Sequence, residues 1–172
     1  MNTKEIQELL CKEEVLKGNL PCENVSNIFY CSESDVVSIL KSGYTVEYEV
    51  KISRSDFKAD AKKSKWKFYN AKVEKGIPNY FYYACPENLI NKNEVPSFAG
   101  LIYVYENGCK IIKKASILHR YKHDLIKLLT KFCRVKSERK YLGSCLLTYK
   151  NNKIKERNTI FAFKTPAQYT PL

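Results

Sequence analysis

The sequence predicts a single α/β domain. Segments with helical spacing of apolar residues alternate with strand-like segments, in the order α-β-β-α-β-β-β-α. The length of 172 residues fits one domain, and a hydrophobic fraction of 44% with 13% aromatics suffices for a packed core. We expect one domain over residues 1–172, with a core at about 4–134 and a weakly patterned C-terminal extension over 137–172.

The first expected element is a helix over residues 4–17, which carries apolar residues at helical spacing and is followed by Gly18. Residues 19–31 contain Pro21 and several asparagines, and are expected to be irregular. The run DVVSIL, beginning at residue 35, is expected to form a hairpin with the strand that follows.

That strand alternates in character from Tyr44 onward, with Gly43 in the turn before it. One side carries Tyr44, Val46, Tyr48, Val50 and Ile52, and the other carries Thr45, Glu47, Glu49, Lys51 and Ser53. This period of two predicts a half-buried strand, whose charged side belongs either to a solvated surface or to an active site.

Residues 55–69 are expected to form one helix, capped by the Ser and Asp residues at its start. A strand over NYFYYA (79–84) follows, and then a hairpin with Asn107-Gly108 in a type I′ turn. Residues 116–133 show amphipathic helical spacing, and a further strand is expected near TIFAF (159–163).

The charge balance points to a polyanionic partner. Lys and Arg outnumber Asp and Glu by 30 to 18, which gives a net charge of +12. No apolar run reaches the ~20 residues of a membrane span, and the N-terminus lacks a secretory signal, so we expect no membrane association. The seven cysteines include no C-x-x-C pair and favour reduced thiols in a cytoplasmic protein.

Three charged residues form a candidate catalytic set. Asp35 stands at the mouth of one strand of the expected hairpin, and Glu49 and Lys51 lie near the far end of the other. A hairpin brings these positions together. Two adjacent carboxylates suit Mg²⁺, and a nearby lysine supplies positive charge to a scissile phosphate. The set therefore predicts metal-assisted phosphodiester hydrolysis.

At these positions the sequence resembles the PD-(D/E)XK nuclease superfamily, with Asp35 as its lone Asp and Glu49-Val50-Lys51 as its E-x-K. The runs EVKISRSDFKAD, YFYYACPENLI and AGLIYVYENG are similar to the MmcB-like branch, found in bacterial repair-associated and phage proteins. The likeness spans about residues 33–118, and it departs from the family pattern at Ser34, where the family has Pro.

The resemblance implies a restriction-endonuclease-like fold, in which helices flank a mixed central β-sheet. It also implies a Mg²⁺-dependent endonuclease or exonuclease, with Mn²⁺ able to substitute. It implies Asp35 and Glu49 as metal ligands and Lys51 as the catalytic lysine. A further Glu ligand from the first helix is assigned to Glu8, with Glu5 and Glu13 as rivals. The expected partner is nucleic acid, with DNA favoured, and a homodimer stays open.

The lysine-rich face after this strand is the expected nucleic-acid contact, because its charges have one sign and follow the candidate site directly. The residues assigned to it are Arg54, Lys58, Lys62 and Lys63. Ser53, Asp56 and Asp60 are expected to cap the helix and orient Lys51.

Other interpretations stay open at this point. Glu49 and Lys51 also fit an exposed strand pair of little energetic value. The chain also fits a catalytically inactive nucleic-acid-binding protein, or a protein-interaction module on the same fold. His119 and His123 have metal-ligand spacing, but their basic neighbours favour a solvent-facing or phosphate-facing role. Trp66 fits either base stacking or helix packing.

Overall fold

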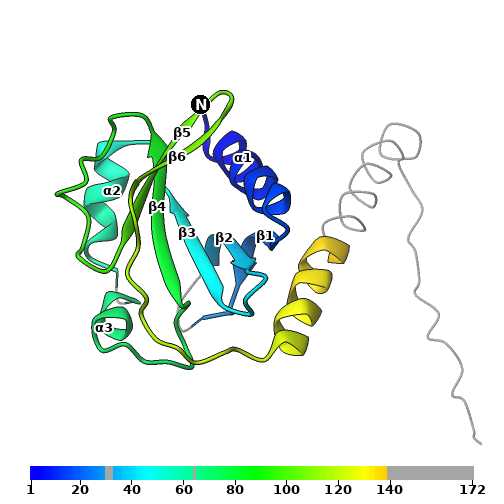
Figure 1. Cartoon of the computed structure of the whole chain (residues 1–172). Coiled ribbons are helices and arrows are strands. Elements are labelled where there is room, and N and C mark those ends of the chain that lie inside the picture. The colour runs from blue at the N-terminus through cyan, green and yellow to red at the C-terminus, as the bar shows by residue number, and fades with distance from the viewer. Residues whose placement is uncertain (30–32, 64, 139–172) are drawn as a thin grey trace, which may run out of the picture. The chain divides into compact units, whose positions relative to one another are not determined.

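The structure is a computed structural model that describes residues 1–29, 33–63 and 65–138 (Figure 1). It is a six-stranded mixed sheet flanked by helices, which confirms the predicted fold class. Met1–Val135 forms one compact unit, and the strand expected near residue 160 lies outside the described residues. The elements are α1 (Thr3–Leu16), β1 (Leu20–Ser26), β2 (Glu33–Ile39), β3 (Thr45–Val50), α2 (Arg54–Asp60), α3 (Lys65–Asn70), β4 (Tyr80–Pro86), β5 (Gly100–Tyr105), β6 (Gly108–Lys113) and a helical segment over 125–138.

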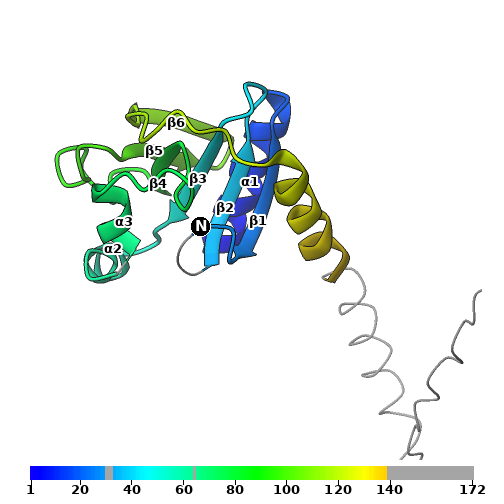
Figure 2. The same ribbon diagram turned by 90° about the horizontal axis from the view of Figure 1, so that it is seen from below.

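The strands lie side by side in the order of the sequence, from β1 to β6. β1, β2 and β3 are antiparallel, β3, β4 and β5 are parallel, and β6 returns antiparallel to β5. The crossover from β3 to β4 carries α2 and α3 over one face of the sheet, and α1 covers the other (Figure 2). Within the described part of the chain, no helix is long and apolar enough to cross a membrane.

Helix α1 forms as predicted, with Asn2 and Glu5 in a reciprocal capping box and Gly18 at a φ of 74° just after its end. Its buried residues Ile6 and Leu10 pack on the apolar side of β2 and β3. On the opposite face an aromatic core forms between the sheet and α3. This core includes Tyr69, Ile77, Phe81, Tyr83, Leu101 and Tyr103.

Residues 20–26 form a strand where the sequence predicted irregular structure. β1 is the edge strand of the sheet, and an edge position tolerates Pro21, which has no backbone N–H to donate. Cys22 and Val25 of β1 are buried beneath Leu128 and Phe132 of the helical segment 125–138. The burial of these residues overrides the turn-like composition of the segment.

The helix predicted over 55–69 is two short helices. After α2 the chain makes tight turns, with the Lys62 and Lys63 amides donating to the carbonyls three residues earlier, and α3 restarts at Lys65. The Trp66 indole Nε1 donates to the carbonyl of Asp60 across the break, at 2.6 Å. The break lets the Lys63 ammonium reach Glu49 of β3, at 2.6 Å, while Lys62 stays exposed.

The helix predicted over 116–133 begins only at residue 125. The buried Asn79 side chain donates to the carbonyls of His119 at 3.0 Å and Tyr121 at 2.8 Å, which holds that segment extended against the sheet. Asp124 then accepts from the amides of Ile126 and Lys127 and caps the helix. In the β5–β6 hairpin Tyr105 pairs with Gly108, so the loop lies one residue earlier than predicted.

Candidate active site

The charged side of β3 is buried, so the predicted half-buried strand and the alternative of an exposed Glu49–Lys51 pair are both wrong. Glu47, Glu49 and Lys51 are only 3%, 4% and 2% exposed. All six residues of β3 are buried because α2 and α3 cover this side of the strand while α1 covers the other. A strand in the middle of a sheet, with helices on both faces, has no solvent side.

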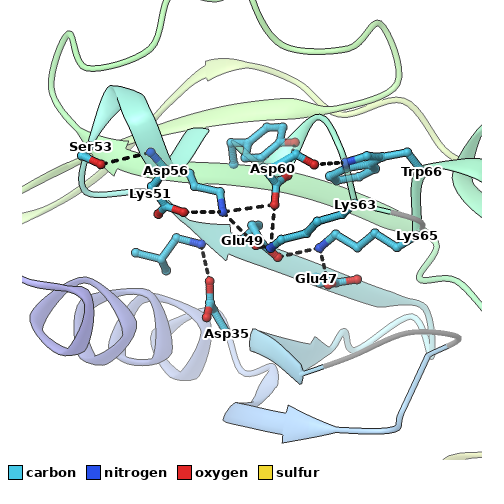
Figure 3. Close-up of polar contacts among 12 residues, drawn as sticks. Asp35, Glu47, Glu49, Lys51, Ser53, Asp56, Asp60, Lys63, Lys65 and Trp66 are labelled. Carbon is cyan, nitrogen blue, oxygen red and sulfur yellow. Dashed lines mark hydrogen bonds and ion pairs between the residues drawn. The ribbon is translucent and has the colours of Figure 1, made fainter. Parts of the chain in front are cut away.

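Asp35 lies beside Glu49, as predicted. β2 and β3 pair antiparallel with Val36 opposite Tyr48, which sets Asp35 next to the end of β3. The Asp35 carboxylate accepts a hydrogen bond from the Val50 amide at 2.7 Å (Figure 3). Its second oxygen, Oδ1, has no hydrogen-bond partner among the described residues.

The electrostatic environment of Asp35 is that of a carboxylate short of positive charge. Burial and the neighbouring charge of Glu49 raise the pKa of Asp35 to about 6, against the smaller opposing effects of the Val50 amide and Lys51. A cation near Asp35 and Glu49 would favour the ionised form of Asp35. Two adjacent carboxylates, one with an unused oxygen, fit the donor set that Mg²⁺ requires from a protein.

Lys51 is held by three carboxylates. Its Nζ lies 2.9 Å from Glu49, 3.1 Å from Asp60 and 3.4 Å from Asp56 (Figure 3). The two aspartates come from α2, which begins here because the Ser53 hydroxyl caps it by accepting from the Asp56 amide at 3.1 Å. Ser53 thus caps α2, while Asp56 and Asp60 hold Lys51, so the two predicted roles are present but belong to different residues.

Two further lysines form ion pairs with Glu49. Lys63 lies 2.6 Å from Glu49 Oε1 and 2.6 Å from Asp60 Oδ1, and Lys65 lies 2.6 Å from Glu49 Oε2 (Figure 3). Burial alone would raise the pKa of Glu49, but the charges of Lys65 and Lys51 outweigh it and hold this pKa well below its usual range. The Lys63 side chain is 44% exposed and that of Lys65 only 4%. Lys63 can therefore turn away from Glu49 into solvent more easily than Lys65.

Lys65 was missed by the sequence analysis, which gave it no role at the candidate site. It lies four residues before the buried Tyr69 in α3, and this spacing puts both on the face toward the sheet. That spacing was the available signal. Lys65 also lies 3.6 Å from Glu47. The Glu47 carboxylate accepts a hydrogen bond from the Tyr69 hydroxyl.

The structure does not bring Glu8 to the site. Its side chain is exposed and pairs with Lys4 at 3.7 Å within α1. The residue of α1 that reaches Asp35 is Gln7, whose amide donates to the Asp35 carbonyl at 3.2 Å and to Asn24 at 2.7 Å. Gln7 shares the buried face of α1 with Leu10, and this helical spacing was a signal that favoured it over Glu8. The rivals do not replace it: Glu5 caps α1, and Glu13 lies by the β5–β6 turn.

The four predicted nucleic-acid contacts separate into two kinds. Lys58 and Lys62 are exposed. Arg54 instead binds Glu94 through two nitrogens, at 2.7 Å and 2.5 Å, and donates to the Leu89 carbonyl at 3.0 Å. With Lys63 bound to Glu49, only the two exposed lysines extend freely from this surface.

The histidine pair is structural, which corrects the expectation that it faces solvent or phosphate. The Nε2 atoms of His119 and His123 lie 2.9 Å and 3.0 Å from the same carbonyl, that of Ile77. His119 is buried, and both rings therefore anchor the extended segment before the last helix. Within residues 1–29, 33–63 and 65–138, no group of three or more His, Cys, Asp or Glu side chains is arranged to hold a metal ion.

Comparison with known proteins supports the fold without naming a function. No protein-family model matches the chain. No curated protein matches it either. Among solved structures the chain is similar to the SPO1766 protein of unknown function from Silicibacter pomeroyi, with a TM-score of 0.62 and 19% sequence identity. The likeness covers 81% of this chain and 88% of the other, and it concerns the fold alone.

Proposed function

We propose that this protein is a metal-dependent nuclease that hydrolyses phosphodiester bonds in nucleic acid, with DNA favoured and Mg²⁺ as its cofactor. The observation that carries the proposal is the buried Glu49–Lys51 pair at the end of β3, with Asp35 beside it on β2. These are the residues on which the resemblance to PD-(D/E)XK nucleases rests, and the fold places them together.

The burial of this set is itself an argument for chemistry. Removing ionised groups from water costs several kcal/mol per ion, and apolar replacements of similar volume are often neutral or stabilising. Stability alone therefore gives little reason to bury Glu49 and Lys51 between a sheet and two helices. A site that must present opposite charges at fixed positions does give one.

Asp35 and Glu49 would hold the metal ion. Asp35 has the unused oxygen Oδ1, and Glu49 can exchange its contact with the half-exposed Lys63 for a contact with the cation. When bound, Mg²⁺ would activate water and neutralise charge that develops on the phosphate. Its affinity should fall below about pH 6, because a proton competes for Asp35.

Lys51 would contribute a fixed positive charge beside the scissile phosphate. Asp56 and Asp60 hold its ammonium in place on the α2 side, so little reorganisation is needed when substrate arrives. The exposed Lys58 and Lys62 would bind neighbouring phosphates on the same side. The net charge of +12 would add long-range attraction to the polyanion.

The test is a cleavage panel of single-stranded, duplex and branched DNA and RNA, in Mg²⁺ or Mn²⁺ against chelator. We expect metal-dependent cleavage by the wild type and none by Glu49→Gln. The matched control is Glu8→Gln, which removes an exposed carboxylate from α1 and should cleave normally. Equal cleavage by Glu49→Gln and wild type would refute the assignment. Glu49→Gln should also melt at a lower temperature, because three lysines lose part of their compensating charge.

One observation favours a second candidate, a nucleic-acid-binding protein without catalysis. Both oxygens of Glu49 are already bound to lysines, so the negative charge of Glu49 is compensated without a metal ion. This candidate predicts binding to nucleic acid in chelator and no cleavage of any substrate in Mg²⁺ or Mn²⁺. Metal-dependent cleavage that Glu49→Gln abolishes would exclude it.

A further inference from the structure

A pocket of about 440 Å³ with aromatic walls lies beside the charged network. Its walls include Phe57, Trp66, Tyr83 and Phe98. Its polar lining includes Lys58, Asn70 and Glu94, and Arg54 already pairs with the Glu94 carboxylate. The volume is within the usual range for a small-molecule site. No part of the proposed catalytic set lines it.

The pocket forms where four elements meet. Phe57 comes from α2, Trp66 from α3, Tyr83 from β4, and Phe98 from the segment before β5. The Phe57 and Tyr83 rings lie edge to face at 5.2 Å, and the Trp66 and Phe98 rings are tilted at 6.1 Å. Phe57, Trp66 and Phe98 are only partly buried, so the pocket presents aromatic surface to solvent.

Asp60 connects the pocket to Lys51. Its backbone carbonyl accepts from the Trp66 indole at 2.6 Å (Figure 3). Its carboxylate accepts from the Tyr83 hydroxyl at 2.7 Å. The other carboxylate oxygen lies 3.1 Å from the Lys51 ammonium. A single side chain thus separates the pocket wall from the proposed phosphate position, which is within the reach of one nucleotide.

We propose that this pocket binds an unstacked nucleobase of the strand whose phosphate lies by Lys51. The proposal rests on the proposed function and specifies its substrate as a strand that is single-stranded or locally unpaired. A nucleobase stacks on aromatic side chains, and Lys58 at the same pocket offers the positive charge that the adjoining phosphate requires. An apolar peptide would gain nothing from that charge.

The pocket should accept different bases. The polar groups of its two largest aromatic walls, the Trp66 indole N–H and the Tyr83 hydroxyl, are already bound to Asp60 and cannot read a base edge. Recognition then depends on stacking, which tolerates every base. We therefore expect similar affinities for oligomers of thymidine and of deoxyadenosine.

The chain offers a direct probe of this pocket, because Trp66 is its single tryptophan. Its fluorescence is to be titrated in chelator with a thymidine oligomer and with an abasic oligomer of the same length. We expect the thymidine oligomer to quench Trp66 and to bind more tightly, and the abasic oligomer to leave the fluorescence unchanged. Equal quenching by the two, or no quenching by either, would overturn the proposal.

A variant series isolates the stacking. Phe98→Ala should weaken binding of the thymidine oligomer by about 5- to 100-fold and leave binding of the abasic oligomer unchanged. Phe98→Leu, which keeps apolar volume without the aromatic face, should show the same selective loss if Phe98→Ala folds poorly. The matched control is Tyr121→Ala, an exposed tyrosine outside the pocket, which should bind both oligomers as the wild type does. Equal losses for both oligomers in the Phe98 variants would overturn the assignment.

These measurements are independent of turnover, because chelator prevents metal-dependent cleavage. Base-dependent quenching without cleavage in Mn²⁺ would support the pocket and refute the nuclease. Metal-dependent cleavage without base-dependent quenching would support the nuclease and refute the pocket.

Discussion

β3 buries two different layers, one on each side of the sheet. Its even-numbered residues pack with α1 in an apolar layer that includes Ile6, Leu10, Val36, Val46, Tyr48 and Val50. Its odd-numbered residues enter a charged layer under α2 and α3 that includes Glu47, Glu49, Lys51, Asp60, Lys63 and Lys65. The two layers share one strand and the same depth of burial, yet their energetics are opposite.

The apolar layer stabilises the fold in proportion to the area it removes from water, at about 25 cal/mol per Å². The charged layer must first recover a desolvation cost of several kcal/mol per ion before it contributes anything. Its ion pairs at 2.6–3.6 Å offset that cost, because three carboxylates meet three ammonium groups at close range. The contrast indicates that the apolar side of β3 serves stability and the charged side serves activity.

Leu10→Ala tests the stability half of this contrast and has the largest expected effect. The Leu10 side chain is buried, so its truncation leaves a cavity and should lower the free energy of unfolding by about 2–5 kcal/mol. Cleavage per folded molecule should not change, because Leu10 touches the apolar layer only. Urea unfolding and a single-turnover assay on the same sample measure both. A cleavage loss in excess of the unfolded fraction would show that the layers are coupled.

Lys51→Met tests whether the charged side of β3 serves activity. Removing this charge should slow single-turnover cleavage by roughly 10²–10³-fold, the scale of losing one preorganised electrostatic contact. Substrate binding should persist, because the exposed lysines still hold phosphates. The matched control is Lys12→Met on the exposed side of α1, which should leave both quantities unchanged. Parallel loss of rate and affinity in Lys51→Met would make Lys51 a phosphate contact only.

The sequence predicted which charged residues come together at the end of β3, but not that they are buried. Alternation along β3 set Glu49 and Lys51 on one side, and hairpin geometry brought Asp35 to them. Alternation cannot show whether a polar side faces water or a second layer, because that depends on which helices cover it. The part of the crossover that covers this side was predicted as one helix over residues 55–69, whereas it forms α2 and α3.

The misread elements share a physical cause, namely tertiary contacts that override local preference. Pro21 disfavours a strand except at an edge, and the sequence does not reveal which strand is the edge. The helix expected from residue 116 is displaced by hydrogen bonds from Asn79, some 40 residues away in the chain. The break between α2 and α3 likewise depends on the bond from Trp66 to Asp60.

Asp35→Asn tests the charged side of β3 through the pH dependence of stability. Burial and Glu49 raise the pKa of Asp35 to about 6, above its unfolded value of about 4. The folded state therefore binds this proton more tightly, and wild-type stability should fall as pH rises from about 4 to 6. Asp35→Asn lacks this loss, so it should match the wild type at pH 4 and exceed it by about 1–3 kcal/mol at pH 8.

Urea unfolding in chelator across this pH range provides the measurement. Adding Mn²⁺ at pH 8 should restore the stability of the wild type and not that of the variant, because only the wild type offers the Asp35 carboxylate to a cation. Parallel stability curves for the two proteins would show that Asp35 titrates normally and that the charged layer needs no cation.

The smallest expected effect separates lysines that face nucleic acid from lysines that belong to the charged layer. Lys62 is exposed, whereas Lys63 is bound to Glu49 and Asp60 at 2.6 Å. In chelator, Lys62→Ala should reduce the salt slope of duplex binding by about 0.9, which is about a threefold affinity change between 50 and 200 mM salt. Lys63→Ala should alter the slope less, because its ammonium already neutralises carboxylates.

Lys63→Ala should instead change the metal dependence of the protein. Its ammonium competes for the Glu49 oxygen that a cation would use, so its removal should lower the Mn²⁺ concentration needed for half-maximal cleavage. Lys62→Ala should leave that concentration unchanged, which makes the two neighbours controls for each other. If both variants reduce the salt slope equally and neither shifts the metal requirement, Lys63 is a phosphate contact and does not belong to the charged layer.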